Sequence, residues 1–206
     1  CEDWSEENVE IVLASANITD VVVAVVNGPK SVVISGSVEA INNTLVLLHS
    51  KSIKAKRLGV TSGFHSECVE SAIPDIRSAA SSILQGHTKV HNNIKFVSTV
   101  TGVELLSTEN KYRNPEYWAS QARNKVKFVT AMENVLGDLE CNVIIEIGPH
   151  PQLCAHIDAI AESISCEVRV IPSMKKDGND WKNICKTAAM LHVSGVPLKW
   201  DQLVEG

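Results

Sequence analysis

From Ser66 onward, the chain alternates long helical patterns with single short strands, and this alternation limits its possible folds more than any other feature. Apolar residues recur at helical spacing over 69–84, and 94–100 then has the composition of a strand. An almost continuously apolar strand at 143–147 is typical of a strand buried on both faces of a parallel sheet. The other expected elements are a short helix from Pro115, a helical stripe over 126–139, a helix from Pro151, a strand at 167–171 and a helix over 180–192. Such alternation predicts an α/β layer.

The first sixty residues follow a different order, with a strand hairpin between two helices. The expected elements are a helix from Ser5 to about Ala16, strands at 21–26 and 31–35, a helix at 39–50 and a strand at 53–60. The order α-β-β-α-β is that of a ferredoxin-like unit that lacks its first strand. We therefore expect a small α+β lobe at 4–61 and part of an α/β core at 62–195.

Composition and charge exclude several classes of protein. With 206 residues, 44% of them hydrophobic and 21% charged, the chain has the profile of a soluble globular protein. Its net charge of −5 argues against a nucleic-acid partner, and its longest apolar run, 21–26, is too short to span a membrane. The six cysteines form no CxxC pair and no signal peptide is visible, so we expect a cytoplasmic location. The sequence leaves open whether Cys1 is a natural start or an arbitrary cut, and the missing initiator methionine and first strand favour the expectation of a cut.

The segment Gly63-Phe64-His65-Ser66 lies where a strand is expected to end and a helix to begin. Enzymes of the α/β class build sites at such sheet edges, and a histidine there can act as a base. Alternatively, His65 is a capping or merely exposed side chain. The segment alone leaves both interpretations open.

Other patterns have structural explanations. The turn at 147–151 follows a buried strand, and its Gly and Pro residues suit a strand-to-helix connection. The hairpin at 26–36 lacks the Gly-Lys-Ser/Thr order of a phosphate loop. His150, Cys154 and His156 lie close together but lack a second pair of ligands, so no metal is expected.

Several segments match, in order and spacing, the motifs of one enzyme family. The matching segments are Val26-Asn27-Gly28-Pro29, Ser31-Val32-Val33-Ile34-Ser35-Gly36, Phe64-His65-Ser66, Ser98-Thr99-Val100-Thr101-Gly102, Tyr117-Trp118, Gln121, Arg123, Val126, Phe128, Glu146-Ile147-Gly148-Pro149-His150-Pro151, Leu191-His192, Gly195-Val196-Pro197 and Trp200. Together they make the chain resemble the acyltransferase domain of modular polyketide synthases and fatty acid synthases, the malonyl-CoA:acyl-carrier-protein transacylase family. The resemblance implies an α/β fold with a partial hydrolase-like α/β core and an incomplete ferredoxin-like α+β lobe. Residues 196–206 would begin the linker that follows the domain.

The resemblance also implies a two-step acyl transfer. In this family a serine attacks an acyl-CoA thioester, and the acyl group then passes to the phosphopantetheine thiol of an acyl carrier protein. His65 matches the histidine that takes the serine proton, and the backbone carbonyl of Gln121 is expected to hold its other ring nitrogen. Ser62, Gly63 and Phe64 match residues that line the acyl pocket. A bulky Phe64 is similar to malonyl-selective members, because a small residue there leaves room for the extra methyl group of methylmalonyl.

The sequence departs from the family pattern in one important respect. No Gly-x-Ser-x-Gly occurs in the 206 residues, so the nucleophilic serine, the family's arginine and its early glutamine are absent from this chain. We therefore expect an acyltransferase that works as part of a larger synthase, with the isolated chain inactive. No cofactor is expected on this chain, since phosphopantetheine belongs to the carrier protein and acyl-CoA is a substrate. Neither a nucleic acid nor a membrane is an expected partner.

Two alternatives remain open. The chain could be a truncated, non-catalytic domain that binds an acyl carrier protein or another synthase domain through a basic cluster, Lys51, Lys54, Lys56 and Arg57. Such a cluster is more often a solvated face that protects an edge strand. The chain could also be an unstable fragment whose exposed sheet edge aggregates.

Overall fold

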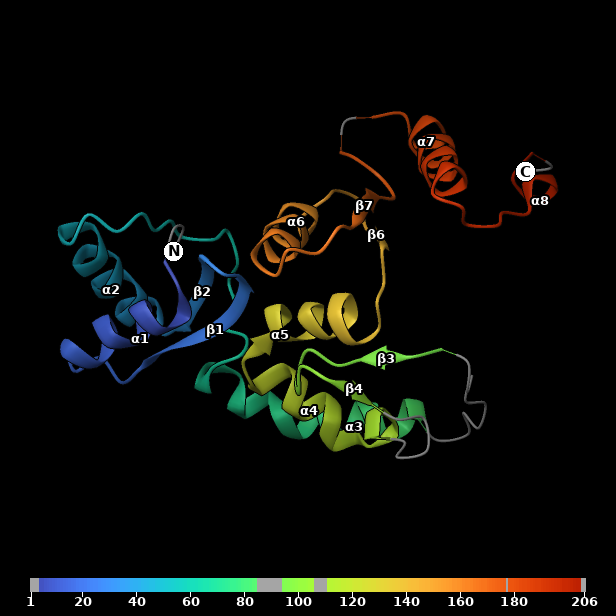
Figure 1. Ribbon diagram of the computed structural model, residues 1–206. Helices are drawn as coiled ribbons and strands as arrows, with labels where there is room; N and C mark the ends of the chain where they lie inside the picture. Colours follow the sequence, from blue (N-terminus) through green and yellow to red (C-terminus); the bar gives the residue numbers. More distant parts are fainter. Residues whose placement is uncertain (1–3, 85–93, 106–110, 177, 205–206) are drawn as a thin grey trace. The chain divides into compact units, whose positions relative to one another are not determined.

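The computed structural model describes residues 4–84, 94–105, 111–176 and 178–204 (Figure 1). The chain forms two compact units, Cys1–Asn134 and Val135–Gly206. Each unit is described by itself below. In the described residues, no helix is both long and apolar enough to cross a membrane.

The first unit begins with a hairpin covered by two helices. The elements are α1 (Glu6–Ser15), β1 (Val21–Gly28), β2 (Ser31–Gly36) and α2 (Val38–Ser50). The β-branched residues of β1 pair antiparallel with β2, as the sequence predicted, and serine side chains cap both helices. Apolar residues of these elements form one core. Its buried members are Val9, Leu13, Val21, Val23, Val32 and Ala40.

The predicted strand at 53–60 is wrong. Ile53 is buried against Val12 and Leu48, but the segment that follows it has no regular structure. The second edge of β1 instead pairs in parallel with β5 (Val126–Lys127), which gives the strand order β2-β1-β5. Alternating apolar and basic residues at 53–60 resemble a strand, yet a strand needs a backbone partner, and β5 occupies the neighbouring edge.

The rest of the first unit is mostly helical. It contains η1 (Glu67–Ala72), α3 (Ile73–Leu84), β3 (Phe96–Val97), β4 (Glu104–Leu105), η2 (Lys111–Arg113), α4 (Pro115–Arg123) and α5 (Phe128–Glu133). Helices α3 and α4 lie side by side, and Val69, Ile73, Ala119 and Ala122 form a core between η1, α3 and α4. The strand expected at 94–100 is only two residues long, because the buried Ser98 starts a tight turn whose backbone returns as β4.

The second unit is a β-α-β unit followed by two helices. It holds η3 (Asn134–Asp138), which starts at the boundary, β6 (Val143–Glu146), α6 (Cys154–Ser163), β7 (Arg169–Pro172), α7 (Asp180–Val193) and α8 (Trp200–Val204). Strands β6 and β7 pair in parallel, which confirms the predicted parallel sheet. The expected burial of both faces of β6 is not found, since Ile145 is 39% exposed. Among the described residues, β6 has a partner strand on one edge alone.

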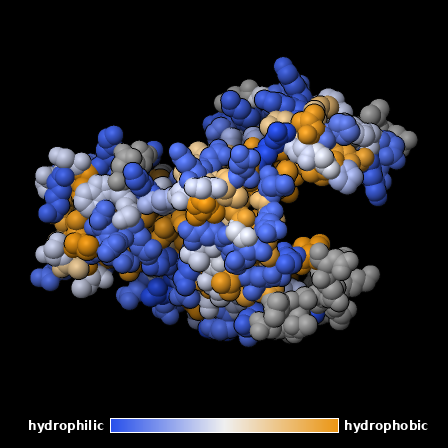
Figure 2. Space-filling view, in the orientation of Figure 1, coloured by the Kyte–Doolittle hydropathy of each residue, from blue (hydrophilic) through white to orange (hydrophobic). Residues whose placement is uncertain are grey.

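Exposed apolar side chains occur on several helices. On α1 and α2 they are Ile11, Val38 and Val46. Figure 2 shows hydrophobic groups among hydrophilic ones over these two helices. Such scattered exposure is usual on protein surfaces and indicates no particular site.

Candidate active site

His65 lies just before η1 and is held by the end of α4. Its backbone N–H donates to the carbonyl of Ala122 at 3.0 Å, and its ring Nδ1 bonds to the carbonyl of Asn124 at 2.9 Å. A carbonyl oxygen can only accept a hydrogen bond, so Nδ1 carries the ring proton. Nε2 therefore keeps its lone pair, and in that tautomer the ring can accept a proton.

The prediction that the carbonyl of Gln121 holds His65 is wrong. Helix α4 ends at Arg123, and Asn124 leaves the helix in an extended conformation, with φ −90° and ψ 160°. The Asn124 carbonyl is consequently turned out of the helical hydrogen-bonding pattern. It accepts the hydrogen bond from Nδ1 of the His65 imidazole. The sequence carries a weak signal for this position, because Asn124 is the first residue beyond the apolar and aromatic pattern of α4.

The other predicted pocket residues lie next to His65 along the chain. Ser62 and Phe64 are exposed, and Gly63 is partly buried. Phe64 is 52% exposed, and the centroid of its ring lies 6.3 Å from that of the His65 ring. The structure thus places a bulky aromatic side chain beside the candidate base.

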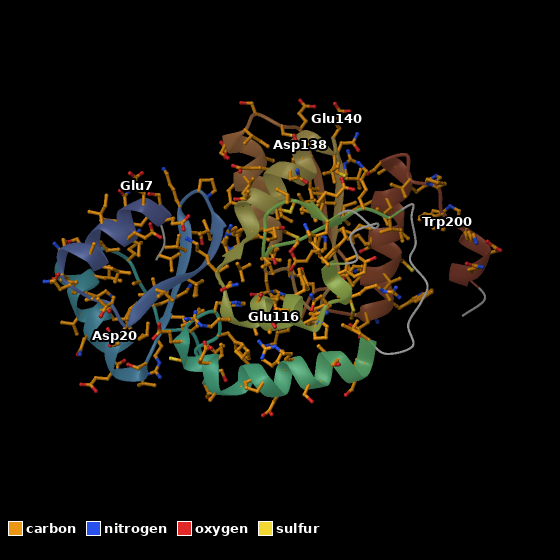
Figure 3. All side chains as sticks on the ribbon, turned by 90° about the horizontal axis from the view of Figure 1, so that it is seen from below. Glu7, Asp20, Glu116, Asp138, Glu140 and Trp200 are labelled. Carbon is orange, nitrogen blue, oxygen red and sulfur yellow. The ribbon has the colours of Figure 1, made fainter. Side chains whose placement is uncertain are left out.

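Ion pairs join the elements around this turn. Arg123 at the end of α4 donates from Nε to Glu70 at 2.9 Å, and Arg77 of α3 donates to Glu116 of α4 at 2.7 and 3.0 Å. The hydrogen bond from Arg77 holds the pKa of Glu116 below its ordinary value. Figure 3 shows Glu116 on α4, the helix beside α3. These exposed pairs contribute little to stability, but they favour one placement of η1 and α3 against α4.

Lys125 follows this end of α4 and connects it to α1. Its ammonium group pairs with Glu6 and lies 3.6 Å from Glu10. Burial works to lower the pKa of Lys125, but the two carboxylates outweigh it and raise the pKa. The residue next to Asn124 is thereby anchored to the first helix of the unit.

The predicted basic cluster is exposed but does not lie on a strand. Lys51, Lys54, Lys56 and Arg57 all belong to the irregular segment after α2. Edge-strand protection is therefore not its role in this structure.

The turn after β6 has the architectural role that its sequence indicated. The Glu146 carboxylate accepts backbone N–H groups of Gln152, Leu153 and Cys154 at 2.7 to 3.1 Å, and the Cys154 thiol at 3.0 Å. These bonds explain why α6 starts at Cys154 rather than at Pro151. Burial and the neighbouring carboxylate raise the pKa of Cys154 to about 12. Within the described part of the chain, no cluster of three or more His, Cys, Asp or Glu residues could hold a metal ion.

Comparison with known proteins shows which protein family the chain belongs to. A model of the acyl transferase domain family matches residues 4–197, so the chain belongs to that family. It is 30% identical over 184 residues to the non-reducing polyketide synthase PKS8-1 of Pseudocercospora fijiensis, covering 87% of this chain and 10% of that protein. It is 29% identical over 202 residues to the polyketide synthase GfsB of Streptomyces halstedii, covering 98% of this chain and 4% of that protein.

Solved structures agree with this assignment. The acyltransferase domain from module 8 of the salinomycin polyketide synthase aligns with a TM-score of 0.80 and 25% identity, covering 97% of this chain and 45% of that one. A malonyl CoA-acyl carrier protein transacylase from Clostridium perfringens aligns with a TM-score of 0.74 and 23% identity, covering 93% and 56%. These likenesses confirm the predicted fold class, a hydrolase-like α/β core with a ferredoxin-like lobe. The boundaries at 4–61, 62–195 and 196–206 stay predictions.

Proposed function

We propose that this chain supplies the general base of an acyltransferase domain within a polyketide synthase, with His65 as that base. The observation that carries the proposal is the 2.9 Å bond between Nδ1 of His65 and the Asn124 carbonyl. It orients the ring and leaves Nε2 as the proton acceptor. Membership of the acyl transferase domain family supports the assignment of the reaction class.

In the proposed reaction, Nε2 of His65 takes the hydroxyl proton of a serine outside this chain as the serine oxygen bonds to the acyl carbon of a malonyl-type CoA thioester. The carbon–sulfur bond breaks, and the imidazolium gives its proton to the departing sulfur. Nε2 next takes the proton of the phosphopantetheine thiol of an acyl carrier protein, whose sulfur attacks the acyl-serine ester. The serine oxygen then leaves and receives that proton, so His65 ends each cycle neutral.

The Asn124 carbonyl has a second part in this scheme. While His65 carries two protons, the carbonyl dipole stabilises the positive imidazolium through the Nδ1–H bond. A backbone carbonyl performs this role whatever the side chain is.

The acyl pocket is proposed to include Ser62, Gly63 and Phe64. The ring of Phe64 stands beside His65, where it would restrict the space for a substituent on the acyl group. One methyl group changes discrimination by only about 1–3 kcal/mol. Malonyl is therefore the proposed unit, with methylmalonyl disfavoured by a modest factor.

A labelling experiment tests the assignment of the base to this chain and of the nucleophile to another segment. The 206-residue chain incubated with malonyl-CoA is expected to show no acyl adduct by intact-protein mass spectrometry, because it has no Gly-x-Ser-x-Gly serine. A polypeptide that also carries the nucleophile segment, found by reading the coding sequence upstream of Cys1, is expected to form the ester and pass it to a carrier protein. A stable adduct on the isolated chain that disappears in His65→Ala would overturn this division of roles.

The four exposed basic residues favour a second candidate function, docking of an acidic carrier protein. Reversing the charge of Lys54, Lys56 and Arg57 to Glu is expected to weaken carrier binding and its salt dependence, whereas His65→Ala leaves binding intact. Isothermal titration with the carrier at two salt concentrations measures both effects. Binding that is indifferent to salt and to charge reversal would exclude docking at this cluster.

A further inference from the structure

The backbone of His65 has an unusual conformation. Its φ of 61° lies in the left-handed region, which only a few per cent of residues other than Gly adopt, Asn, Asp and His more often than the rest. The conformation directs the His65 N–H to Ala122 and the ring to Asn124. A conformation of this kind persists only where surrounding contacts determine it, so the residues around His65 must hold it.

The side chain of Ser66 makes two hydrogen bonds that close the turn around His65. Its hydroxyl donates to the carbonyl of Gly63 at 2.6 Å and accepts the N–H of Cys68 at 3.3 Å. Ser66 is only 3% exposed, so water cannot readily replace either bond. One hydroxyl thereby joins the residue two before His65 to the residue three after it.

Gly63 shows how tightly this turn is closed. A Cβ atom added to Gly63 would lie 2.8 Å from Cβ of Cys68, closer than Cβ atoms approach other atoms in proteins, and 3.1 Å from its Sγ, which is a tight contact. The two ends of the turn are therefore in contact, and position 63 has no room for a side chain. The Ser66 Oγ lies 3.3 Å from the same added atom, so the hydroxyl and the packing of Cys68 against Gly63 belong to one closed turn.

We propose that Ser66 is a positioning residue for His65, which keeps the histidine in the left-handed conformation that presents its ring to the Asn124 carbonyl. A serine that served solely as the cap of η1 would need just the longer bond, to Cys68. The shorter bond links Ser66 to Gly63, so it joins residues on either side of His65 in the sequence. It has no part in the cap of η1. This inference rests on the proposed role of His65 as a base.

The test measures the tautomer of His65 in the full 206-residue chain. With ¹⁵N-labelled histidine, NMR shifts of Nδ1 and Nε2 are expected to report a predominantly Nδ1–H ring in the wild type. In Ser66→Ala, this preference is expected to be lost, with shifts that approach an average of the two tautomers. Ser66→Thr keeps the hydroxyl and should keep the wild-type shifts. If Ser66→Ala does not fold, Ser66→Cys, of similar size but with a weaker donor, should show partial loss.

Ser37→Ala is the matched control, since Ser37 caps α2 through a comparable bond to the N–H of Ala40 at 3.2 Å. It should lower the melting temperature without moving the His65 shifts. The inference is overturned if Ser66→Ala keeps the Nδ1–H tautomer and changes only stability, as Ser37→Ala does. Because the readout needs no acyl transfer, its failure is separate from failure of the base assignment, which transfer rates in His65→Ala decide.

Discussion

Replacing His65 by alanine is expected to slow acyl transfer by roughly 10²- to 10⁴-fold in a polypeptide that carries both this chain and the nucleophilic serine. Without the imidazole, the serine hydroxyl and the carrier thiol must lose their protons to water. Both half-reactions should slow, because the same nitrogen serves each. Single-turnover measurements with malonyl-CoA, and then with the carrier protein, separate the two halves.

His49→Ala is the matched control for this substitution. His49 also has a ring nitrogen 2.9 Å from a backbone carbonyl, that of Ala55, but it lies on α2, away from the His65 turn in the sequence. Its removal should leave both half-reactions close to the wild-type rates. Asn124→Ala should do the same, since the backbone carbonyl that holds His65 remains. Wild-type rates in His65→Ala would exclude the histidine as the base.

Local patterns predicted the β1–β2 hairpin and several helices of this chain, but not the β3–β4 hairpin or the strand β5 at the start of the stripe expected over 126–139. The run of valines in β1 and the turn expected at 27–30 were sufficient to predict the hairpin, although the strand extends to Gly28 and the turn is at 29–30. Helical spacing located α2, α3 and α7 to within a few residues. Long, strongly patterned elements depend mainly on neighbours in sequence. Their prediction therefore needs little knowledge of the rest of the molecule.

Contacts between distant segments could not be predicted in the same way. The segment at 53–60 has the composition of a strand, but β5 (Val126–Lys127), which lies much later in the chain, pairs with the edge of β1. For His65 the sequence identified the imidazole, while its acceptor differed by three residues because the end of α4 determines which carbonyl turns outward. The left-handed backbone of His65 is equally invisible in sequence, since it results from Ser66, Gly63 and Ala122 together.

The substitution Glu146→Gln is expected to lower the free energy of unfolding by about 1–2 kcal/mol at neutral pH. The carboxylate receives three backbone N–H groups at the start of α6, and the amide of glutamine turns a donor toward some of them. The loss should lie at this modest level because Glu146 is partly exposed and water screens its charge. Urea unfolding of the chain measures it. Glu162 is exposed and lies on α6 itself, so Glu162→Gln is the control and should have almost no effect on the free energy of unfolding.

The difference in free energy of unfolding between wild type and Glu146→Gln should depend on pH, and this dependence tests whether the charge of Glu146 is its cause. Burial acts to raise the pKa of Glu146, but the hydrogen bonds from Cys154, Gln152 and Leu153 outweigh it and lower the pKa below the ordinary 4.5. A carboxyl group whose folded pKa is lowered stabilises the fold above its unfolded pKa, and this stabilisation is lost as pH falls through the folded pKa. The gap between wild type and Glu146→Gln should thus be full at neutral pH and shrink below about pH 4.5. If the difference in free energy of unfolding stays constant as the pH falls below the pKa of Glu146, then the shape of the side chain, and not its charge, stabilises the start of α6.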